Sequence, residues 1–333
     1  MSRGPAASRR LTFVAALMAF ILSGCAWNTA GSTGCIPDRR ASPLASGLGE
    51  SSGLAPAGDL DSITFWTHND SGSEPILYRV ALDGSVSDSV RIATPQAQPR
   101  DLEAMERAPC PEGRCLYVAD VGDNEERRED AVIYRFPEPE PGIGPVAATP
   151  LPIRFPEGPT DVEALFVLPG ERIHLVSKGR SRPVTVYRYP RPLRPNERVT
   201  VERVQALTSD PPFLPRYVTG AAADPGGRLV AVRTYETLHF YGVEDGRLTP
   251  IRGGEVVLRS LREAQGEAVA FLPDGRLLLS SEAGPLGRRG GLVILRCPDL
   301  PTARFGSTGS ATGFRFEVSG GRTTDSSQGR RRG

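Results

Sequence analysis

Asp101-Leu-Glu-Ala-Met105, Asp161-Val-Glu-Ala-Leu165 and Gln265-Gly-Glu-Ala-Val269 are three copies of one short pattern. Glu50-Ser-Ser-Gly-Leu54 and Tyr217-Val-Thr-Gly-Ala221 are two more divergent copies. The fourth residue of every copy is small, and the copies recur roughly every 50 residues, a period typical of repeat architectures. The sequence therefore predicts five similar structural units.

Each copy begins a unit with the features of three short strands. In four units a turn follows the first apolar run, at Pro111-Glu-Gly-Arg114, Pro169-Gly-Glu-Arg172, Pro225-Gly-Gly-Arg228 and Pro273-Asp-Gly-Arg276. Four third runs carry a tyrosine that we expect to pack between units: Tyr78, Tyr134, Tyr187 and Tyr241. Three strands with a variable fourth are typical of a propeller blade. We predict an all-β, five-bladed β-propeller of four-stranded antiparallel blades; six blades are the alternative, if a degenerate unit lies in residues 93–99 or beyond Pro298.

Composition agrees with a chain made of many short strands. The 333 residues include 37 Gly and 31 Pro, which favour turns. With 40 basic and 39 acidic side chains the net charge is +1, so charge predicts no nucleic-acid partner. The same composition excludes collagen, coiled coil and disorder throughout the chain.

Residues 1–24 have the features of a lipoprotein signal peptide. Basic residues precede the apolar run 11–22, which is too short to span a bilayer as a stop-transfer helix. Leu22-Ser-Gly-Cys25 resembles the bacterial lipobox, in which the cysteine receives a diacylglyceryl group. We expect lipidation at Cys25, attachment to a bacterial membrane through that lipid, and a place in the cell envelope after export. Ordinary cleavage nearby is the alternative.

The remaining chain divides into a flexible tether (25–41), the propeller (42–300) and a C-terminal extension (301–333) that we expect to be disordered from about residue 319. Export permits disulfides. Cys110 and Cys115 flank a turn, whereas Cys35 and Cys297 lie near the two ends of the folded region. A bond between the latter pair would lock an N-terminal strand that closes the ring. Phe314-Arg-Phe-Glu-Val318 is a competing closing strand.

Polar residues near the strand ends are expected to share one axial funnel. The start of the first strand and the end of the second lie at the same end of an antiparallel hairpin. The repeat positions predicted there are Glu50, Asn69, Glu103, Asp120, Glu163, Lys178, Arg233, Glu267 and Glu282. Residues of single blades that interrupt the repeat are stronger functional candidates, and these are His68, Asn69, Asp70, Asp123, Asn124, Arg127 and Tyr235.

Crowded carboxylates cannot all stay ionised without compensation. Ca²⁺ could bind among oxygen ligands, with Asp120, Asp123 and Asn124 as candidates. Alternatively, Lys178 and Arg233 pair with the acids, or the funnel awaits a polar ligand. The purely structural interpretation of Glu103, Glu163 and Glu267 is a hydrogen bond to backbone amides of a neighbouring blade, and for residues 69–72 and 122–124 it is turn formation.

Several strings resemble exported bacterial β-propeller proteins and, more remotely, the phytase-like and SdiA-regulated propeller families. They are the five repeat copies, Trp66-Thr-His-Asn-Asp-Ser-Gly72, Asp120-Val-Gly-Asp-Asn124 with Arg127, and Val232-Arg-Thr-Tyr235. The resemblance covers about residues 48–298 and implies a propeller fold. Phytase-like relatives imply calcium-dependent phosphoester hydrolysis.

The sequence contains no nucleophile elbow, zinc-protease motif, Walker loop or Rossmann fingerprint. We therefore expect a lipid-anchored propeller that binds a small polar ligand, a polymer or a partner protein in its acidic funnel. The alternative is a calcium-dependent hydrolase of a phosphoester or lactone, with His68 or a metal-bound water as the base.

Overall fold

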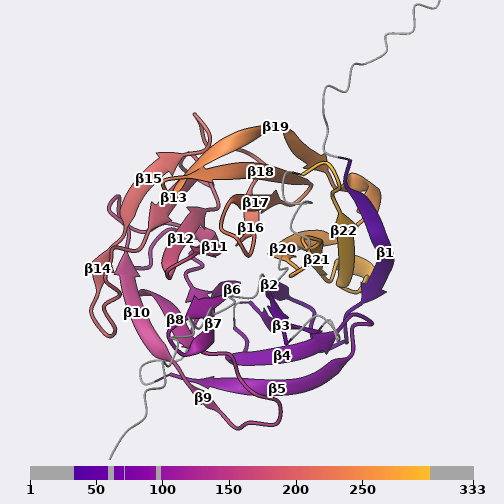
Figure 1. Cartoon of the computed structure of the whole chain (residues 1–333), viewed down its shortest axis with the longest axis horizontal. Coiled ribbons are helices and arrows are strands. Elements are labelled where there is room, and N and C mark those ends of the chain that lie inside the picture. Colours follow the sequence, from indigo (N-terminus) through magenta and orange to yellow (C-terminus); the bar gives the residue numbers. More distant parts are fainter. Residues whose placement is uncertain (1–33, 59–63, 71, 95–98, 301–333) are drawn as a thin grey trace, which may run out of the picture.

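Five β-sheets surround one axis in the computed structural model, which describes residues 34–58, 64–70, 72–94 and 99–300 (Figure 1). A copy of the repeat lies at the start of each innermost strand. These strands are β2 (Ser51–Ala57), β6 (Leu102–Cys110), β11 (Val162–Leu168), β16 (Val218–Ala223) and β20 (Gln265–Phe271). The predicted five-bladed propeller is confirmed, and the described residues form no sixth sheet.

Blades 1 and 2 each carry a fifth, parallel strand that the sequence did not predict. Blade 1 continues with β3 (Thr64–Asn69), β4 (Ile76–Ala81), β5 (Val86–Ala93) and the short β9 (Val146–Ala147). Blade 2 continues with β7 (Gly113–Asp120), β8 (Ala131–Pro137), β10 (Thr149–Arg154) and the short β14 (Val199–Thr200). Both added strands come from connections that pass along the outer edge of the preceding blade, where they cover an open strand edge.

Blades 3, 4 and 5 have four antiparallel strands. Blade 3 continues with β12 (Arg172–Ser177), β13 (Thr185–Arg188) and β15 (Glu202–Ala206). Blade 4 continues with β17 (Leu229–Thr234), β18 (Thr237–Glu244) and β19 (Arg247–Val257). Blade 5 continues with β21 (Leu277–Glu282) and β22 (Gly291–Arg296), and its outer strand is β1 (Ile36–Pro43).

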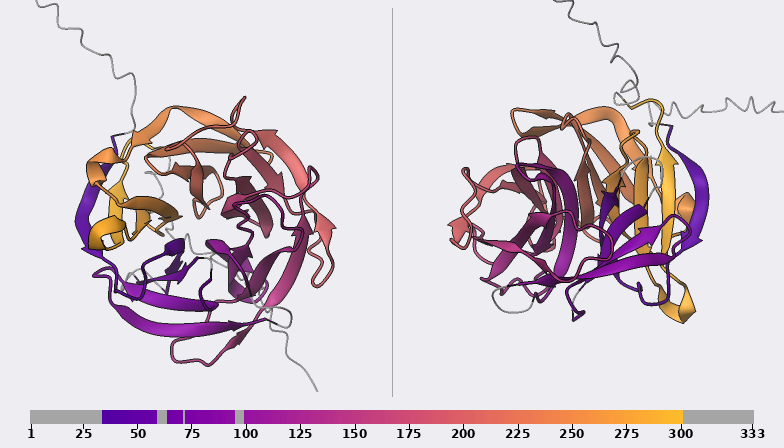
Figure 2. Two further views of the ribbon diagram at one scale, coloured as in Figure 1. Left: turned by 180° about the vertical axis from the view of Figure 1, so that it is seen from behind. Right: turned by 60° about the horizontal axis from the view of Figure 1, so that its bottom comes forward.

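Strand β1 closes the ring. It pairs antiparallel with β22 from Ile36 opposite Arg296 to Pro43 opposite Gly291, and the two strands lie side by side in every view (Figures 1 and 2). The closing strand starts at Ile36, so the propeller begins earlier than the predicted residue 42 and takes in the end of the expected tether. The predicted disulfide between Cys35 and Cys297 is confirmed. The predicted signal peptide, the lipidation site Cys25, the C-terminal extension and the competing strand 314–318 lie outside the described residues.

Apolar side chains fill the spaces between neighbouring blades. Leu54 and Phe65 of blade 1, for example, belong to one buried cluster with Ala268 and Leu278 of blade 5. The small fourth residue of the repeat is needed where inner strands approach closely. A Cβ atom on Gly220 would lie 2.8 Å from the backbone oxygen of Glu267 in the next blade. The repeated tyrosines pack in or against these clusters, as predicted.

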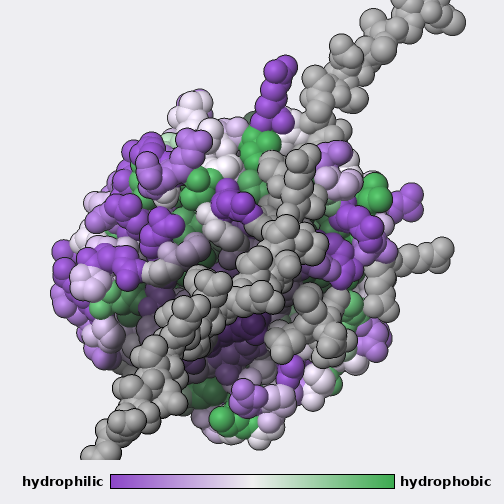
Figure 3. Space-filling view, in the orientation of Figure 1, coloured by the Kyte–Doolittle hydropathy of each residue, from purple (hydrophilic) through white to green (hydrophobic). Residues whose placement is uncertain are grey.

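Helical structure in the described part of the chain is limited to two short 3-10 turns, η1 (Arg259–Leu261) and η2 (Pro285–Gly287). No helix of the described residues is long and apolar enough to cross a membrane. Hydrophilic residues predominate on the face shown in the space-filling view, and the hydrophobic ones are scattered (Figure 3).

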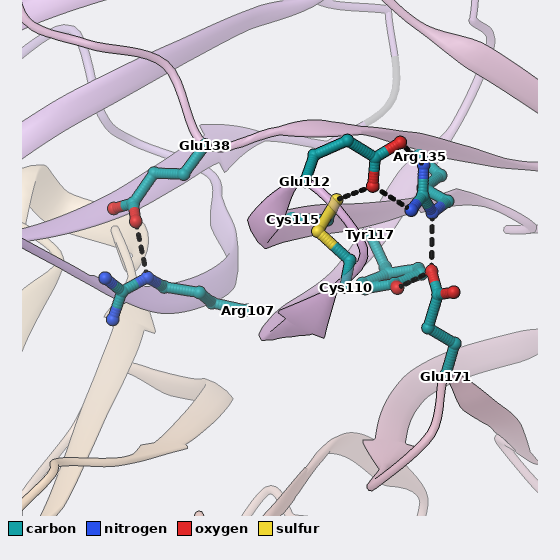
Figure 4. Close-up of a disulfide and its surroundings, with 8 residues drawn as sticks. All are labelled: Arg107, Cys110, Glu112, Cys115, Tyr117, Arg135, Glu138 and Glu171. Atoms are coloured by element: carbon teal, nitrogen blue, oxygen red, sulfur yellow. Dashed lines mark hydrogen bonds and ion pairs between the residues drawn. A yellow bond between two sulfur atoms is a disulfide. The ribbon is translucent and has the colours of Figure 1, made fainter. Parts of the chain in front are cut away.

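The second predicted disulfide, Cys110 to Cys115, joins the ends of β6 and β7 and is also confirmed (Figure 4). Beside it, Arg135 of β8 bonds both Glu112 at 2.5 Å and Glu171 at 2.7 Å. Glu171 belongs to the turn between β11 and β12, so this cluster ties blade 2 to blade 3 (Figure 4).

We predict that the two disulfides stabilise the fold unequally. Cys35 and Cys297 are 262 residues apart and Cys110 and Cys115 only 5 apart. In the chain-entropy model, removing them costs about 5.6 and about 2 kcal/mol respectively. Urea unfolding of Cys35→Ala with Cys297→Ala, compared with Cys110→Ala with Cys115→Ala as the matched control, measures the difference. Equal losses in the two variants would contradict closure through β1.

Candidate functional site

A β-bulge interrupts every inner strand at the third residue of the repeat. The register shifts between Ser51 and Gly53, Leu102 and Ala104, Val162 and Ala164, Val218 and Gly220, and Gly266 and Val269. A bulge leaves one residue out of the ladder and changes the direction of its side chain. The third residues are Ser52, Glu103, Glu163, Thr219 and Glu267, so the bulges turn two hydroxyls and three carboxyls away from the regular strand faces.

Hydroxyl groups of this set link neighbouring inner strands. Ser52 Oγ donates to the backbone oxygen of Glu103 at 2.9 Å and lies 3.2 Å from its Oε2. Thr219 Oγ1 donates to the backbone oxygen of Glu267, also at 2.9 Å. The three glutamates are 3% to 5% exposed. None of them accepts a described hydrogen bond from a backbone amide, which was the structural role considered for them.

The carboxyl groups at the starts of the inner strands form a cluster that we call the acidic mouth. It comprises Glu50, Asp70, Asp101, Glu103, Asp161, Glu163, Glu267 and Glu282, with Lys178 and Tyr235 beside them. The charge of Glu163 acts on Glu103 of the preceding blade and on Glu267 and Glu282 of blade 5. Acids of nonadjacent blades thus meet at the axis.

Burial and mutual repulsion favour the protonated forms of these acids. Burial, followed by the charge of Glu163, raises the pKa of Glu103 well above its usual value, and burial with the charge of Glu282 does the same to the pKa of Glu267. For Glu163, burial outweighs the attraction of Lys178 and the pKa is about 7. At neutral pH the inner part of the mouth therefore holds several protons.

The outer acids of the mouth behave similarly. Burial and the charges of Glu282 and Glu50 raise the pKa of Asp70 to about 8. Burial, with the charge of Glu50, raises the pKa of Glu282 to about 7, and Gln265 donates to this carboxyl at 2.7 Å. Asp101 Oδ1 is buried and has no hydrogen-bond partner among the described residues.

Cations are confined to one side of the mouth. Lys178, the only lysine of the chain, bonds Glu163 and lies 3.9 Å from Asp161. Arg180 Nε lies 3.3 Å from Asp161 Oδ2. Within the described structure, the other six acids of the mouth have no ion pair: Glu50, Asp70, Asp101, Glu103, Glu267 and Glu282. The acids without an ion-pair partner thus lie on the side of blades 1, 2 and 5.

The loop after β7 carries the three residues predicted to bind calcium. Asp120 Oδ1 accepts from Asp101 N and from Arg128 Nη2, both at 2.9 Å. Asp123 Oδ2 accepts from Arg128 N at 2.7 Å, and Asn124 Oδ1 accepts from Arg180 Nη2 at 2.5 Å. These internal hydrogen bonds favour a structural role for Asp120, Asp123 and Asn124, whose metal role stays a prediction.

The mouth itself offers no preformed cage for a metal ion. In the described ranges, the one group of three ligand-type side chains with their ligand atoms within 4.8 Å of one another is Cys110, Glu112 and Cys115. The two cysteines are joined in a disulfide, so they cannot bind a metal as thiolates.

His68 is not placed to act as a base in the funnel. Its side chain is fully buried against Gly53, where a Cβ atom on that glycine would collide with Nε2. Burial lowers the pKa of His68 to about 4, and Nδ1 lies 3.1 Å from the backbone oxygen of Asn69. The bulge at Ser52 accounts for the difference from the sequence prediction, because it shifts the pairing of the two strands beside His68.

Two predicted arginines also lie outside the mouth. Arg233 is completely buried and donates through Nη1 to the backbone oxygens of Ala268 and Ser280, at 2.8 and 2.9 Å. Its Nη2 pairs with Glu263, so Arg233 joins blade 4 to blade 5. The Arg127 side chain is 79% exposed and pairs with Glu125 alone among the described residues.

Of the remaining predicted residues, Asn69 supports the chain before β2 and Tyr235 lies at the mouth. Asn69 accepts from Glu50 N at 3.2 Å and donates to the backbone oxygen of Gly47 at 2.9 Å, so it holds the segment before β2. Tyr235 borders the mouth, where burial and the charge of Glu267 raise the pKa of its phenol. The sequence prediction omitted Ser52 and Gln265, although Ser52 is the third residue of one repeat copy and Gln265 the first residue of another.

No protein-family model and no curated protein matches this sequence. Solved structures match it at low identity. A PQQ-bound aldose sugar dehydrogenase from Streptomyces coelicolor is 14% identical over 78% of this chain and 99% of its own, with a TM-score of 0.45. The calcium-binding protein regucalcin from Agrobacterium tumefaciens is 13% identical over 76% and 92%, with a TM-score of 0.42. Virginiamycin B lyase from Staphylococcus aureus is 11% identical over 80% and 75%, with a TM-score of 0.37. We draw neither an activity nor a ligand from these similarities.

The raised pKa values of Glu103 and Glu267 predict a pH-dependent stability. In the unfolded chain these groups lose their protons near pH 4, whereas the folded protein retains them to higher pH. Their contribution to stability is full below about pH 4 and is lost as pH rises through the folded-state pKa values. Glu103→Gln with Glu267→Gln should raise the free energy of unfolding at pH 8 by more than about 1 kcal/mol, and by much less at pH 5.

Urea unfolding at both pH values measures this effect, and Glu140→Gln at an exposed position is the control. A double variant that gains the same stability at pH 5 and pH 8 would exclude shared proton retention in the mouth.

Proposed function

We propose that this chain is an exported, lipid-anchored propeller whose acidic mouth binds a small polar ligand that carries positive charge. The observation that carries the proposal is the set of six acids at one end of the axis without an ion pair among the described residues. A ligand with several hydrogen-bond donors would satisfy these acids, including the unpartnered Asp101 Oδ1.

Because the acids of the mouth retain protons, binding of such a ligand should depend on pH. At neutral pH the acids of the mouth are partly protonated, because repulsion between them is otherwise uncompensated. A cationic ligand favours the ionised carboxylates and therefore releases protons on binding. Affinity should rise with pH between 6 and 8, the range spanned by the pKa values of Glu282, about 7, and Asp70, about 8.

The calcium-dependent hydrolase receives less support from the geometry. Asp120, Asp123 and Asn124 bond internal donors, and His68 is fully buried. The described residues also show no nucleophile held by a base at the mouth. Binding is therefore the function that the contacts favour.

Isothermal titration with spermidine as the probe tests the proposal. We expect binding that weakens with salt and releases protons. Asp70→Asn with Glu282→Gln should weaken it about tenfold or more, which corresponds to about 1.4 kcal/mol. Glu140→Gln should not change it. No binding of spermidine, or equal affinity in the double variant, would refute the mouth as a cation site. Stoichiometric calcium binding with turnover of p-nitrophenyl phosphate or a γ-lactone would favour the hydrolase instead.

The proposed anchor rests on the position of Cys25 directly after the apolar run 11–22. We expect bacterial cells that express the chain to incorporate labelled palmitate into it, and mass spectrometry to find Cys25 as its first residue. Cys25→Ser should abolish the label. Retained label in this variant, or a mature chain that begins elsewhere, would rule the anchor out.

A further inference from the structure

A cavity lies at the end of the axis opposite the acidic mouth. It has a volume of about 240 Å³ and is formed where the inner strands end and turn. Every blade contributes one proline to its wall, and these are Pro56, Pro109, Pro169, Pro225 and Pro273. We call this cavity the proline collar. The last four of these prolines are exposed, so the collar is open at its rim.

Glu106 is one of two buried acids that line the collar, and the other is Asp224. Glu106 lies within β6, where the inner strands of the other blades carry Ala55, Phe166, Ala222 and Ala270 at the same repeat position. The residue is 8% exposed and lines the cavity. Its Oε2 accepts a hydrogen bond from the backbone N of Ala223 in β16, at 3.3 Å. The side chain therefore reaches across the axis from blade 2 to blade 4.

This carboxyl lacks a cationic partner in the part of the chain that the structure describes. Neighbouring Arg107 pairs with Glu138 at 2.6 Å, and the charge of Asp224 acts on Glu106 with the same sign. Burial raises the pKa of Glu106 well above its usual value. A buried carboxylate is costly unless it is paired, so this group needs either a proton or a cation that enters the cavity.

The walls around Glu106 favour an apolar body next to that cation. Besides the five prolines, Ala108, Val167 and Phe271 line the cavity, and all three are nearly buried. The charged residues Arg107, Arg114 and Asp224 also line it. Apolar walls with a few placed polar groups are typical of sites for small organic ligands. Asp224 already accepts hydrogen bonds from the backbone N atoms of Gly226, Arg228 and Leu229. A hydrated metal ion would therefore find few available oxygen ligands beside Glu106, which is fewer than Ca²⁺ requires.

We propose that the proline collar binds a small organic amine with an apolar substituent, whose ammonium group pairs with Glu106. The protonated carboxyl releases its proton to solvent as the ammonium group binds, so that charge balances in the site. This binding is independent of the ligand proposed for the acidic mouth, because no residue is shared between the two sites.

Isothermal titration with benzylamine tests the collar, with benzyl alcohol as its neutral analogue. Titrations at pH 6.5 in two buffers of different ionisation enthalpy count the released protons. We expect benzylamine to bind with release of protons and benzyl alcohol to bind at least about tenfold more weakly. Glu106→Gln should weaken benzylamine binding about tenfold and abolish the proton release. Glu282→Gln, in the acidic mouth, should change neither.

A second variant tests the collar without altering the buried Glu106, whose replacement could disturb folding. Pro109 lies on the exposed rim of the collar. The larger ring in Pro109→Trp should obstruct the cavity and also weaken benzylamine binding. Circular dichroism checks that both variants fold. The proposal is overturned if the unaltered protein fails to bind benzylamine, if Glu106→Gln binds it equally well, or if Glu282→Gln and not Pro109→Trp reduces the affinity.

Discussion

Five inner strands start around one axis, and the acids at their first residues must be held together there against their mutual repulsion. The fold meets this constraint with three means. Hydroxyls of Ser52 and Thr219 fix the strands that carry Glu103 and Glu267. Lys178 neutralises part of the charge on one side. Retained protons compensate for the rest, at a cost in stability as the pH rises. Closure of the ring by β1 and the Cys35–Cys297 bond keeps the strands from separating.

The two ends of the axis differ because the inner strands change character along their length. The repeat copies at their starts carry most of the polar side chains, whereas their last residues are apolar and lead toward the turns. Glu106 lies in the later half of its strand and bonds a strand of a nonadjacent blade. One axis thus presents an acidic mouth at one end and, at the other, a proline-lined collar whose acids are Glu106 and Asp224.

The repeat predicted the blade count, the antiparallel hairpins and the packing role of Tyr134 and Tyr187, because each follows from local pattern and period. The two disulfides followed from the positions of the cysteines and from the expectation of export. Contacts between blades were not predictable, since they depend on the angle at which sheets meet. Arg233 looked like a funnel residue and instead joins two blades, and the bulge at Ser52 alters the strand pairing beside His68. Glu106 had a signal in the sequence, an acid where the other units have Ala or Phe, but its contact with Ala223 required the closed ring.

The central claim is that Glu103 and Glu267 meet other acids at the axis and retain their protons near neutral pH. The most direct measurement is a pH titration of the side-chain carboxyl carbons by NMR in ¹³C-glutamate-labelled protein, with signals assigned through the corresponding glutamine variants. The account predicts titration midpoints for both residues well above the usual value of about 4.3 for glutamate. Midpoints close to that value would show that the two groups are solvated and separate, which contradicts a shared acidic mouth.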